Sequence, residues 1–414
     1  LVGSEMCIRD SPIAGEFEGQ HISKARKLIG EKLAQKGLVD HIDENYKHVV
    51  RTCYKCGTLI EPQIKNQWFV RMKPLAEKAL EKINRGEITY LPEQYKKIST
   101  YWLEHIMDWN ISRQIVWGIP IPAKICDVCE KGFVDLEDTL TTCTQCHGDL
   151  RKDIDTFDTW FSSGQWPFAS LGYPHSPDFE NYYPTDVLET AGEIIFFWVS
   201  RMIMLGLYVT GKIPFKTVYL HGLVLDAKGQ KMSKSKGNVI NPLDFTNKYG
   251  TDAFRIGMVI GNTPGTSLAL SEERIRGYGK FANKIWNATR FVLEQTQGFD
   301  ENAKLDEEDA KSEKELHTLM AEITTEMDEY KFYLVGEKLY HYFWHTFADI
   351  TIERSKKKIL EGKNSESAKL LLYSQLIVLV KALHPFMPFV TEEIWSLLPH
   401  QKTQQFLMGE VWPR

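Results

Sequence analysis

Residues 219–238 read YLHGLVLDAKGQKMSKSKGN, and this stretch decides how the rest of the chain is interpreted. The β-branched and apolar run from Thr217 to Leu225 predicts a short buried strand. The strand opens into a loop with four lysines between Lys228 and Lys236, no acidic residue in that span, and glycines at 229 and 237. Lysine supplies a mobile positive charge, and glycine lets the backbone approach a ligand closely. The pattern indicates a phosphate-binding loop, although a solvated basic surface loop has the same composition.

Four short sequence motifs, one of them inside this stretch, change that balance. They are KMSKS at 231–235, TDVLET at 185–190 leading into IIFFW at 194–198, DTFDTWFSS at 155–163, and DWNISRQ at 108–114. With these motifs the chain resembles the class I aminoacyl-tRNA synthetases, and among them the valyl-tRNA synthetases, from about residue 15 to its end.

Length and composition are those of an ordinary globular protein. The chain has 414 residues, enough for two or three domains, with 43% hydrophobic and 25% charged residues. The net charge of −5 means that a nucleic-acid partner must be met by local basic patches. The longest apolar run, Ile194–Val209, contains Ser200 and Arg201 and is too short for a membrane span, so we expect a buried helix and no membrane partner.

The seven cysteines fall as Cys7 alone and three C-x-x-C pairs. This spacing favours metal binding over disulfides and suggests a reducing cytoplasm. Cys126, Cys129, Cys143 and Cys146 are local to one another, with 13 residues between the two pairs. They predict a complete structural Zn²⁺ site of four thiolates, which leaves no position for a catalytic water.

The remaining pair, Cys53 and Cys56, is followed by Gly57 and is half of such a site. The resemblance implies that two further ligands would come from a segment upstream of this chain. The alternative is a reduced pair in a turn.

The fold class expected from the resemblance is the second half of an α/β Rossmann-like catalytic domain with a zinc-binding insertion, followed by an all-α helical-bundle anticodon-binding domain. Residues 1–14 fit nothing that follows and are expected to be a non-native leader. The other expected parts are an editing-domain remnant at 15–48, a catalytic domain at 49–265 with its zinc loop at 123–152, a stem-contact helix and linker at 266–310, and the helical anticodon-binding domain at 311–414.

Helical periodicity predicts most of the larger elements. The expected helices cover 73–84, 101–108, 194–205, 272–293, 316–327, 331–357 and 367–383, with a polar linker at 297–312. Asp252 is expected to cap the helix that carries Arg255, and Thr391 the last helix. Tyr330, Arg354 and residues 356–358 are the best RNA contacts that the sequence offers in the bundle.

The resemblance also implies the site residues. Lys231 and Lys234 would neutralise charge on the triphosphate of ATP, assisted by Mg²⁺. Glu193 keeps the carboxylate that would bond the ribose, although Ala191 replaces a glycine of most family members. The full set expected to bind ATP is Glu193, His221, Gly222, Val224, Lys231, Met232, Ser233, Lys234 and Ser235.

Two other groups are implied beside the nucleotide. Trp160 and Trp198 would form opposite walls of the amino-acid pocket, although tryptophans are more often plain core residues. Arg113 and Gln114 would lie at the edge of the active site near the end of the tRNA, although Arg113 could be a surface arginine.

The implied function is ATP-dependent activation of L-valine to valyl-adenylate and transfer to tRNA(Val) by a cytoplasmic, monomeric enzyme. Because the family's HIGH motif and most of the editing domain are not in this sequence, we expect the chain to be a C-terminal fragment that is inactive alone. The alternatives are isoleucyl specificity, a tRNA-binding fragment without catalysis, and a zinc-ribbon adaptor.

Overall fold

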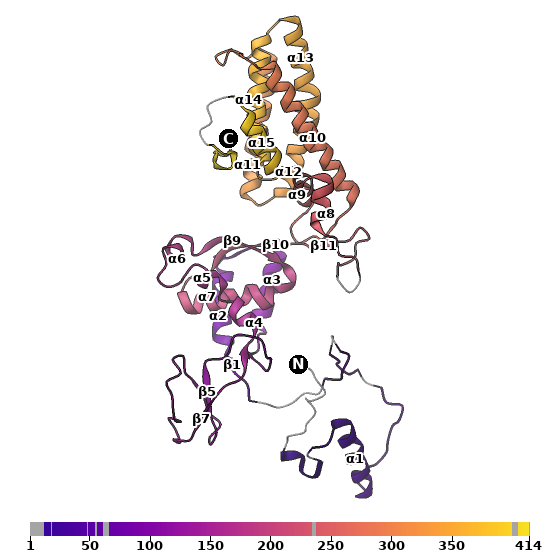
Figure 1. Cartoon of the computed structure of the whole chain (residues 1–414), viewed down its shortest axis with the longest axis vertical. Helices are drawn as coiled ribbons and strands as arrows, with labels where there is room; N and C mark the ends of the chain where they lie inside the picture. Colours follow the sequence, from indigo (N-terminus) through magenta and orange to yellow (C-terminus); the bar gives the residue numbers. More distant parts are fainter. Residues whose placement is uncertain are drawn as a thin grey trace. The chain divides into compact units, whose positions relative to one another are not determined.

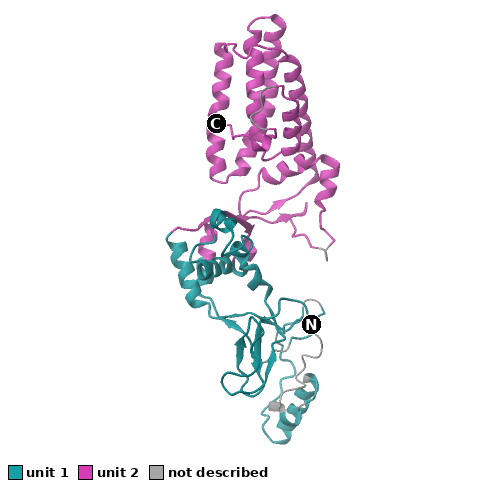
Figure 2. Ribbon diagram, turned by 60° about the vertical axis from the view of Figure 1, so that its left-hand side comes forward, with its two compact units in different colours: residues 1–85, 100–184, 196–214 teal, residues 86–99, 185–195, 215–414 magenta. Residues whose placement is uncertain are grey.

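The computed structural model describes residues 12–17, 19–47, 49–53, 56–60, 66–233, 237–399 and 405–413. The chain divides into two compact units (Figure 2). Unit 1 comprises residues 1–85, 100–184 and 196–214, and unit 2 comprises residues 86–99, 185–195 and 215–414.

Unit 2 contains a three-stranded parallel sheet in the order β2 (Thr89–Leu91), β10 (Phe215–His221), β9 (Thr185–Ala191). Val218 on the central strand pairs with Tyr90 on one side and Leu188 on the other. Val218 and Leu220 have no exposed surface, so the central strand is buried on its core side. The chain passes from β9 to β10 through a helical segment, which is the β–α–β connection expected of a Rossmann-like half.

That helical segment differs in detail from the prediction for 194–205. It begins with a 3₁₀ turn (η3, Gly192–Ile194), continues as a π-helix (η4, Ile195–Val199) and ends as α7 (Ser200–Thr210). By length and composition alone, Gly192–Thr210 could cross a membrane, but 56% of that window is buried in the protein, as in the core helix of a globular domain.

The strand predicted over 217–225 is broken at Gly222. β10 ends at His221, and a short strand β11 (Val224–Leu225) pairs in parallel with β12 (Leu268–Ala269). A Cβ atom on Gly222 would lie 1.8 Å from the carbonyl oxygen of Thr266, so the two backbones touch there. The break redirects the chain from the sheet into the lysine loop.

Unit 1 is built around α2 (Lys73–Asn84), which packs against α7. The predicted bounds of α2 are confirmed, and its buried face consists of Ala76, Ala79 and Ile83. The helix predicted at 101–108 instead covers 94–104 (α3, Gln94–Glu104). Asp108 lies beyond the end of α3, and its carboxylate accepts a hydrogen bond from Met72 N, 3.1 Å away, at the start of α2.

The other elements of unit 1 are short. Strand β3 (Trp109–Asn110) pairs with β1 (Phe69–Val70), and β4 (Ser112–Arg113) with β8 (Thr156–Phe157), both antiparallel. The remaining helices are η2 (Pro12–Phe17), α1 (Ile22–Gln35), α4 (Thr159–Ser163), α5 (Trp166–Ala169) and α6 (Pro177–Tyr182).

A separate antiparallel sheet in unit 1 carries the predicted zinc loop. Strand β5 (Ala123–Cys126) lies between β6 (Gly132–Val134) and β7 (Leu150–Lys152). Lys124 on β5 pairs with Asp135 and Asp138, at 3.1 Å and 2.8 Å, and so ties this sheet to the chain that follows β6.

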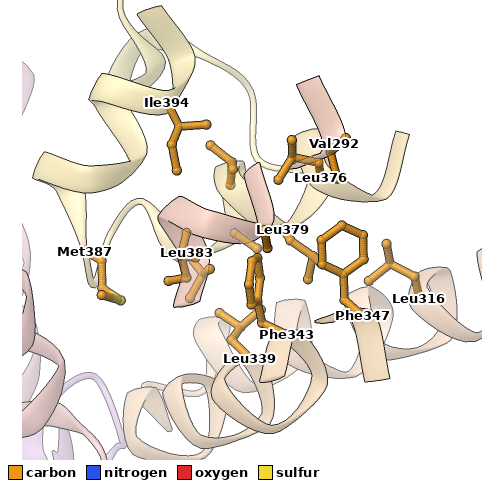
Figure 3. Packing of buried hydrophobic residues seen from close by; sticks show 14 of the residues in the cluster. Val292, Leu316, Leu339, Phe343, Phe347, Leu376, Leu379, Leu383, Met387 and Ile394 are labelled. Atoms are coloured by element: carbon orange, nitrogen blue, oxygen red, sulfur yellow. The ribbon is translucent and has the colours of Figure 1, made fainter. Parts of the chain in front are cut away.

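The C-terminal part of unit 2 is a helical bundle (Figure 1). Its elements are α8 (Pro242–Tyr249), α9 (Thr251–Val259), α10 (Glu272–Gln295), α11 (Glu307–Asp328), α12 (Phe332–His341), a π-helix η6 (Tyr342–Thr351), α13 (Ile352–Glu361), α14 (Ser365–Leu383), α15 (Pro388–Leu397) and the 3₁₀ turn η7 (Leu407–Gly409). Figure 3 shows their core, where Phe343 and Phe347 of the π-helix face Leu379 and Leu383 of α14.

Two predicted elements of the bundle are corrected. The linker expected over 297–312 is shorter, because Asp306 caps α11 by accepting a hydrogen bond from Asp309 N at 2.9 Å. The helix expected over 331–357 reaches Glu361 and contains the π-helix η6, which widens the turn where Phe343 and Phe347 are buried.

Both predicted helix caps are wrong. Thr391 lies inside α15, which begins three residues earlier at Pro388, a residue favoured at the first helical position. Asp252 does not cap its own helix α9. Its carboxylate instead accepts hydrogen bonds from Phe389 N at 3.1 Å and Val390 N at 2.6 Å, and so caps α15 across 137 residues of sequence.

Three of the suggested RNA contacts have internal partners, and one of them, Lys356, pairs with Glu353 at 2.5 Å. Arg354 donates to Asp309 at 3.1 Å and to Ser312 at 3.0 Å, and Lys358 pairs with Asp306 at 2.7 Å and with Asp309 at 2.9 Å. Because Asp309 is fully buried, these cations stabilise the start of α11.

Candidate functional site

The carboxyl ends of β9 and β10 bring several predicted nucleotide residues together in unit 2. His221 ends β10, and its Nδ1 is hydrogen-bonded to the carboxylate of Glu189 on β9. Glu193 follows β9 by two residues, and both of its carboxylate oxygens accept hydrogen bonds from Lys231 Nζ, at 2.9 Å and 3.0 Å. In parallel α/β sheets, ligands bind outside these strand ends.

The lysine loop is held by a residue pair that the sequence analysis missed. Asp226 accepts hydrogen bonds from Lys228 N at 2.9 Å, from Gln230 N at 2.8 Å and from Asn238 Nδ2 at 2.9 Å. The hydrogen bond from Asn238, together with those from the loop backbone, lowers the pKa of Asp226. The sequence signal was present, because an Asp three residues before Gly229 is typical of a turn closed by its own side chain.

Asn238 closes the other side of the same loop. Its Oδ1 accepts a hydrogen bond from Ser233 N at 2.9 Å, and its Nδ2 also lies 3.3 Å from the carbonyl oxygen of Lys231. Met232 Sδ accepts from Ile240 N at 3.4 Å. Asn238 therefore holds the first three residues of the KMSKS segment, and Asp226 holds the turn before it. Lys234 and Ser235 lie outside the described residues.

Gly222 and Val224 have packing roles in the structure. The contact with Thr266 leaves no room for a side chain at Gly222. Val224 packs against a small buried cluster that contains Ala253, Leu270 and Ile275. Their assignment to ATP binding stays a prediction.

Arg113 and Gln114 both contact residues of the motif at 155–163. Arg113 Nη2 lies 2.7 Å from Asp158 Oδ2, and Gln114 Nε2 donates to Asp155 Oδ2 at 2.7 Å. Two of the sequence motifs quoted above, DWNISRQ and DTFDTWFSS, are thus in contact within unit 1.

Trp160 lies in α4 and Trp198 lies in η4, and the two rings have different neighbours. The ring of Trp160 stacks on Phe197, with centroids 5.7 Å apart and planes at 27°. Trp198 donates its indole N–H to the carbonyl oxygen of Ser163, 3.1 Å away, and its ring lies 6.0 Å from that of Trp166. That the two tryptophans face one pocket stays a prediction.

The two cysteine pairs of the zinc loop form matching turns. Cys126 O accepts from Glu130 N and Cys143 O from His147 N, both at 3.0 Å, and Glu130 and His147 both have left-handed backbones. In each turn a backbone N–H points at the first sulfur, and Gln145 N lies 3.4 Å from Cys143 Sγ. Burial raises the pKa of the Cys143 thiol, but N–H groups from Cys146 and Gln145 lower it more, to about 6.

The geometry of the four sulfurs fits zinc. All four Sγ atoms lie within 4.8 Å of one another, with Cys126–Cys146 at 3.4 Å and Cys129–Cys143 at 3.7 Å. A tetrahedral zinc with Zn–S bonds of about 2.3 Å separates its sulfurs by about 3.8 Å. The cluster is therefore compatible with Zn²⁺, which would cross-link β5 to the chain between β6 and β7.

Cys53 and Cys56 are the remaining cysteine pair of the described residues. Gly57 N donates to Cys53 O at 2.8 Å, and Gly57 has a φ of 72°, a left-handed backbone that favours glycine. Within the described ranges, no further cysteine, histidine or carboxylate joins the pair to make a metal cluster.

Two protein-family models match the chain. The model of tRNA synthetases class I (I, L, M and V) matches residues 16–271, and the model of the anticodon-binding domain of tRNA ligase matches residues 309–414. The first match alone covers more than half of the chain. The chain belongs to the class I tRNA synthetases. The lysine loop, the β9–β10 edge and the cysteine cluster of this synthetase all lie inside the first matched region.

Curated relatives of this synthetase include the valine–tRNA ligases of Carboxydothermus hydrogenoformans, 43% identical over 97% of the chain, and Geobacter sulfurreducens, 42% identical over 96%. The chain spans 46% of the length of each.

Solved structures confirm the fold of this synthetase. Methionyl-tRNA synthetase of Mycobacterium tuberculosis bound by methionyl-adenylate aligns with 85% of the chain and 66% of its own, with a TM-score of 0.65 and 18% identity. The ternary complex of Agrobacterium radiobacter LeuRS, tRNA and LeuAMS covers 74% of the chain and 42% of its own, with a TM-score of 0.58 and 23% identity.

Proposed function

We propose that this chain is part of a valine–tRNA ligase, an enzyme that activates valine with ATP and transfers the valyl group to tRNA(Val). The observation that carries the proposal is the position of Lys231, which leads the KMSKS segment and contacts Glu193 at the carboxyl ends of β9 and β10. The choice of valine as the amino-acid substrate is supported by the relatives, which are valine–tRNA ligases at 42–43% identity.

In the first step, the carboxylate of valine attacks the α-phosphate of ATP and displaces pyrophosphate. Displacement at phosphorus is catalysed mainly by positioning and by stabilising the negative charge that accumulates on oxygen. Lys231 and Lys234 would supply the positive charge that stabilises these oxygens, with Mg²⁺ bound to the nucleotide. The hydrogen bond from Asn238 to Asp226 links the two sides of the loop, and the bond from Ser233 N to Asn238 holds the described part of the KMSKS segment beside it.

The second step transfers the valyl group to the terminal ribose of tRNA, and unit 2 offers a surface for the RNA. A groove of about 620 Å³ lies among α8, α9, α10 and α15. Its lining includes Lys248, Arg276, Lys280 and Asn283. Lysine and arginine side chains bind RNA phosphates whatever the base sequence. This groove would therefore position tRNA, and other contacts would distinguish tRNA(Val) from other tRNAs.

The zinc site would support the fold without taking part in chemistry. Four thiolates fill a tetrahedral coordination sphere and leave no open position for water or substrate. Reduced paired cysteines also support a cytoplasmic location.

The experiment uses a protein of the relatives' full length that carries this sequence, called the full-length protein below. Amino-acid-dependent exchange between ATP and pyrophosphate is measured with valine, isoleucine and threonine, and charging is then measured with tRNA(Val). We expect exchange with valine at a kcat/KM about 100-fold above that with isoleucine, the scale on which a pocket rejects one extra methylene. Preference for isoleucine, or charging of a different tRNA, would contradict the proposal.

A further inference from the structure

A buried carboxylate in unit 1 connects three of the sequence motifs. Asp158 Oδ2 accepts hydrogen bonds from the indole N–H of Trp109 at 2.9 Å and from Arg113 Nη2 at 2.7 Å, and Asp158 Oδ1 accepts from Trp160 N at 3.2 Å. The side chain of Asp158 is 9% exposed. The last of these bonds makes Asp158 the N-cap of α4, the helix that carries Trp160.

A buried arginine lies on the other side of this carboxylate. The guanidinium carbon of Arg201 lies 3.7 Å from the centroid of the Trp109 ring, and Arg201 Nη1 lies 3.8 Å from Asp158 Oδ2. Its side chain is 8% exposed, and Nη1 has no hydrogen-bond partner among the described residues. Burial lowers the pKa of Arg201 to about 10, and Asp158 opposes that shift.

An arginine is a costly residue at this position. Its neighbours on α7, Met202, Ile203 and Met204, are apolar and fully buried, and an apolar side chain would complete the same helix without burying a charge. Stability of α7 alone therefore does not account for Arg201. The charge is offset by Asp158 and by the faces of the surrounding aromatic rings.

The positions of the two charged residues connect them to one pair of aromatic rings. Asp158 precedes Trp160 by two residues on one element. Arg201 follows Phe197 by four residues on the helical segment formed by η4 and α7. Its guanidinium carbon lies 5.6 Å from the centroid of the Phe197 ring. Trp160 and Phe197 stack on each other, and Phe197 is 45% exposed, so part of this ring pair is open to a ligand.

We propose that Asp158 and Arg201 are positioning residues that hold the stacked rings of Trp160 and Phe197 as an apolar wall for the branched side chain of the amino-acid substrate. The inference rests on the proposed function. Neither charged group touches the substrate. Asp158 orients Trp160 through the helix cap, and Arg201 supports the Phe197 ring and links it to Asp158 through their ion pair.

The test is Asp158→Asn in the full-length protein, with valine-dependent exchange as the readout. The amide keeps the shape, but it removes the counter-charge of Arg201 and directs a donor at the donors of Trp109 or Arg113. We expect the KM for valine to rise about tenfold, while kcat and the KM for ATP change less than about threefold, because the wall contacts valine alone. A merely structural role would lower the amount of active enzyme and leave the KM for valine unchanged.

Asp153→Asn is the matched control. Asp153 lies in the same unit and also accepts an indole N–H, from Trp68 Nε1 at 2.6 Å, but it contacts neither α4 nor Arg201 in this structure. Its KM for valine should equal that of the unmodified protein. If Asp153→Asn raises this KM as much as Asp158→Asn does, the proposed positioning role of Asp158 is overturned.

Arg201→Lys keeps the test decisive if Asp158→Asn does not fold. Lysine retains the charge but has no planar group to lie on Trp109, so the KM for valine should again rise about fivefold or more. An unchanged KM for valine in this variant overturns the inference. If the unmodified protein shows no exchange with any amino acid, the proposed function fails as well. If the unmodified protein prefers isoleucine, only the proposed substrate fails. The variants are then compared by their KM for isoleucine.

Discussion

Lys231 and Glu193 contact each other through two hydrogen bonds of 2.9 Å and 3.0 Å. Both are expected to bind ATP, the lysine at the triphosphate and the glutamate at the ribose. The pair therefore has to separate when the nucleotide enters. It is an exposed ion pair, with side chains 63% and 55% accessible, so separation costs little.

The first prediction concerns Glu193. In the full-length protein, Glu193→Gln should raise the KM for ATP about tenfold, because the hydrogen bond from the ribose to a charged carboxylate becomes a weaker one to a neutral amide, while the KM for valine stays the same. Steady-state exchange kinetics measure both constants. Lys228→Ala, a change in the same loop outside the KMSKS segment, is the control and should leave the KM for ATP within about twofold. Equal effects of the two changes would favour a basic loop without a specific role.

The second prediction concerns zinc. Elemental analysis of the purified chain should give one zinc per chain, bound by the four-cysteine cluster. Cys126→Ser combined with Cys143→Ser should abolish binding, because each turn loses its first thiolate. Cys53→Ser with Cys56→Ser is the matched double change and should retain the metal. Zinc that survives in the first variant would show that another site holds it.

The third prediction concerns the link between α9 and α15. Asp252→Ala should lower the free energy of unfolding by about 1–2 kcal/mol, because two N–H groups at the start of α15 lose their acceptor. Urea unfolding of the chain measures it. Asp328→Ala, an exposed change at the end of α11, should alter stability by less than about 0.5 kcal/mol. A loss no larger for Asp252 than for Asp328 would refute the capping role.

The fourth prediction concerns pH. Burial lowers the pKa of His384, whose Nδ1 lies 2.8 Å from Thr391 Oγ1. The unfolded chain then binds a proton at a higher pH than the folded chain does. Stability is therefore full above the unfolded pKa of about 6.5, falls as the pH drops from there through the lowered folded pKa, and levels off below it.

His384→Asn removes the titrating ring but keeps a polar group that can reach Thr391. The difference in thermal midpoint between pH 7.5 and pH 5.5 should be smaller in this variant than in the unmodified chain. If both lose the same amount on acidification, another group controls the acid sensitivity.

Short-range sequence patterns predicted the structure well where the chemistry is local. The bounds of α2 were predicted from an apolar face of Leu75, Ala79, Leu80 and Ile83, of which Ala79 and Ile83 are buried together with Ala76. The zinc turns follow from cysteines three residues apart. The KMSKS segment was identified by its letters. In each case the interacting residues are close in sequence, so a short sequence pattern includes all of them.

Long-range contacts could not be predicted in this way. Asp252 resembles the cap of its own helix in sequence, and only the packing of α9 on α15 assigns it to Phe389 and Val390, 137 and 138 residues away. The bond from Trp109 to Asp158 spans 49 residues. A buried acceptor attracts whichever donors the fold brings to it, and the local sequence does not say which these are.

Catalysis by the KMSKS lysines is tested by the effect of Lys234→Ala on valine-dependent exchange between ATP and pyrophosphate in the full-length protein. Lys234 lies outside the described residues, but its place in KMSKS predicts that it stabilises charge on the α-phosphate. The account predicts a fall in kcat of at least about 100-fold with little change in the KM for valine. Lys236→Ala, two residues further on, should change kcat by less than about threefold. Small and equal effects of the two changes would contradict the claim that the KMSKS lysines take part in the reaction.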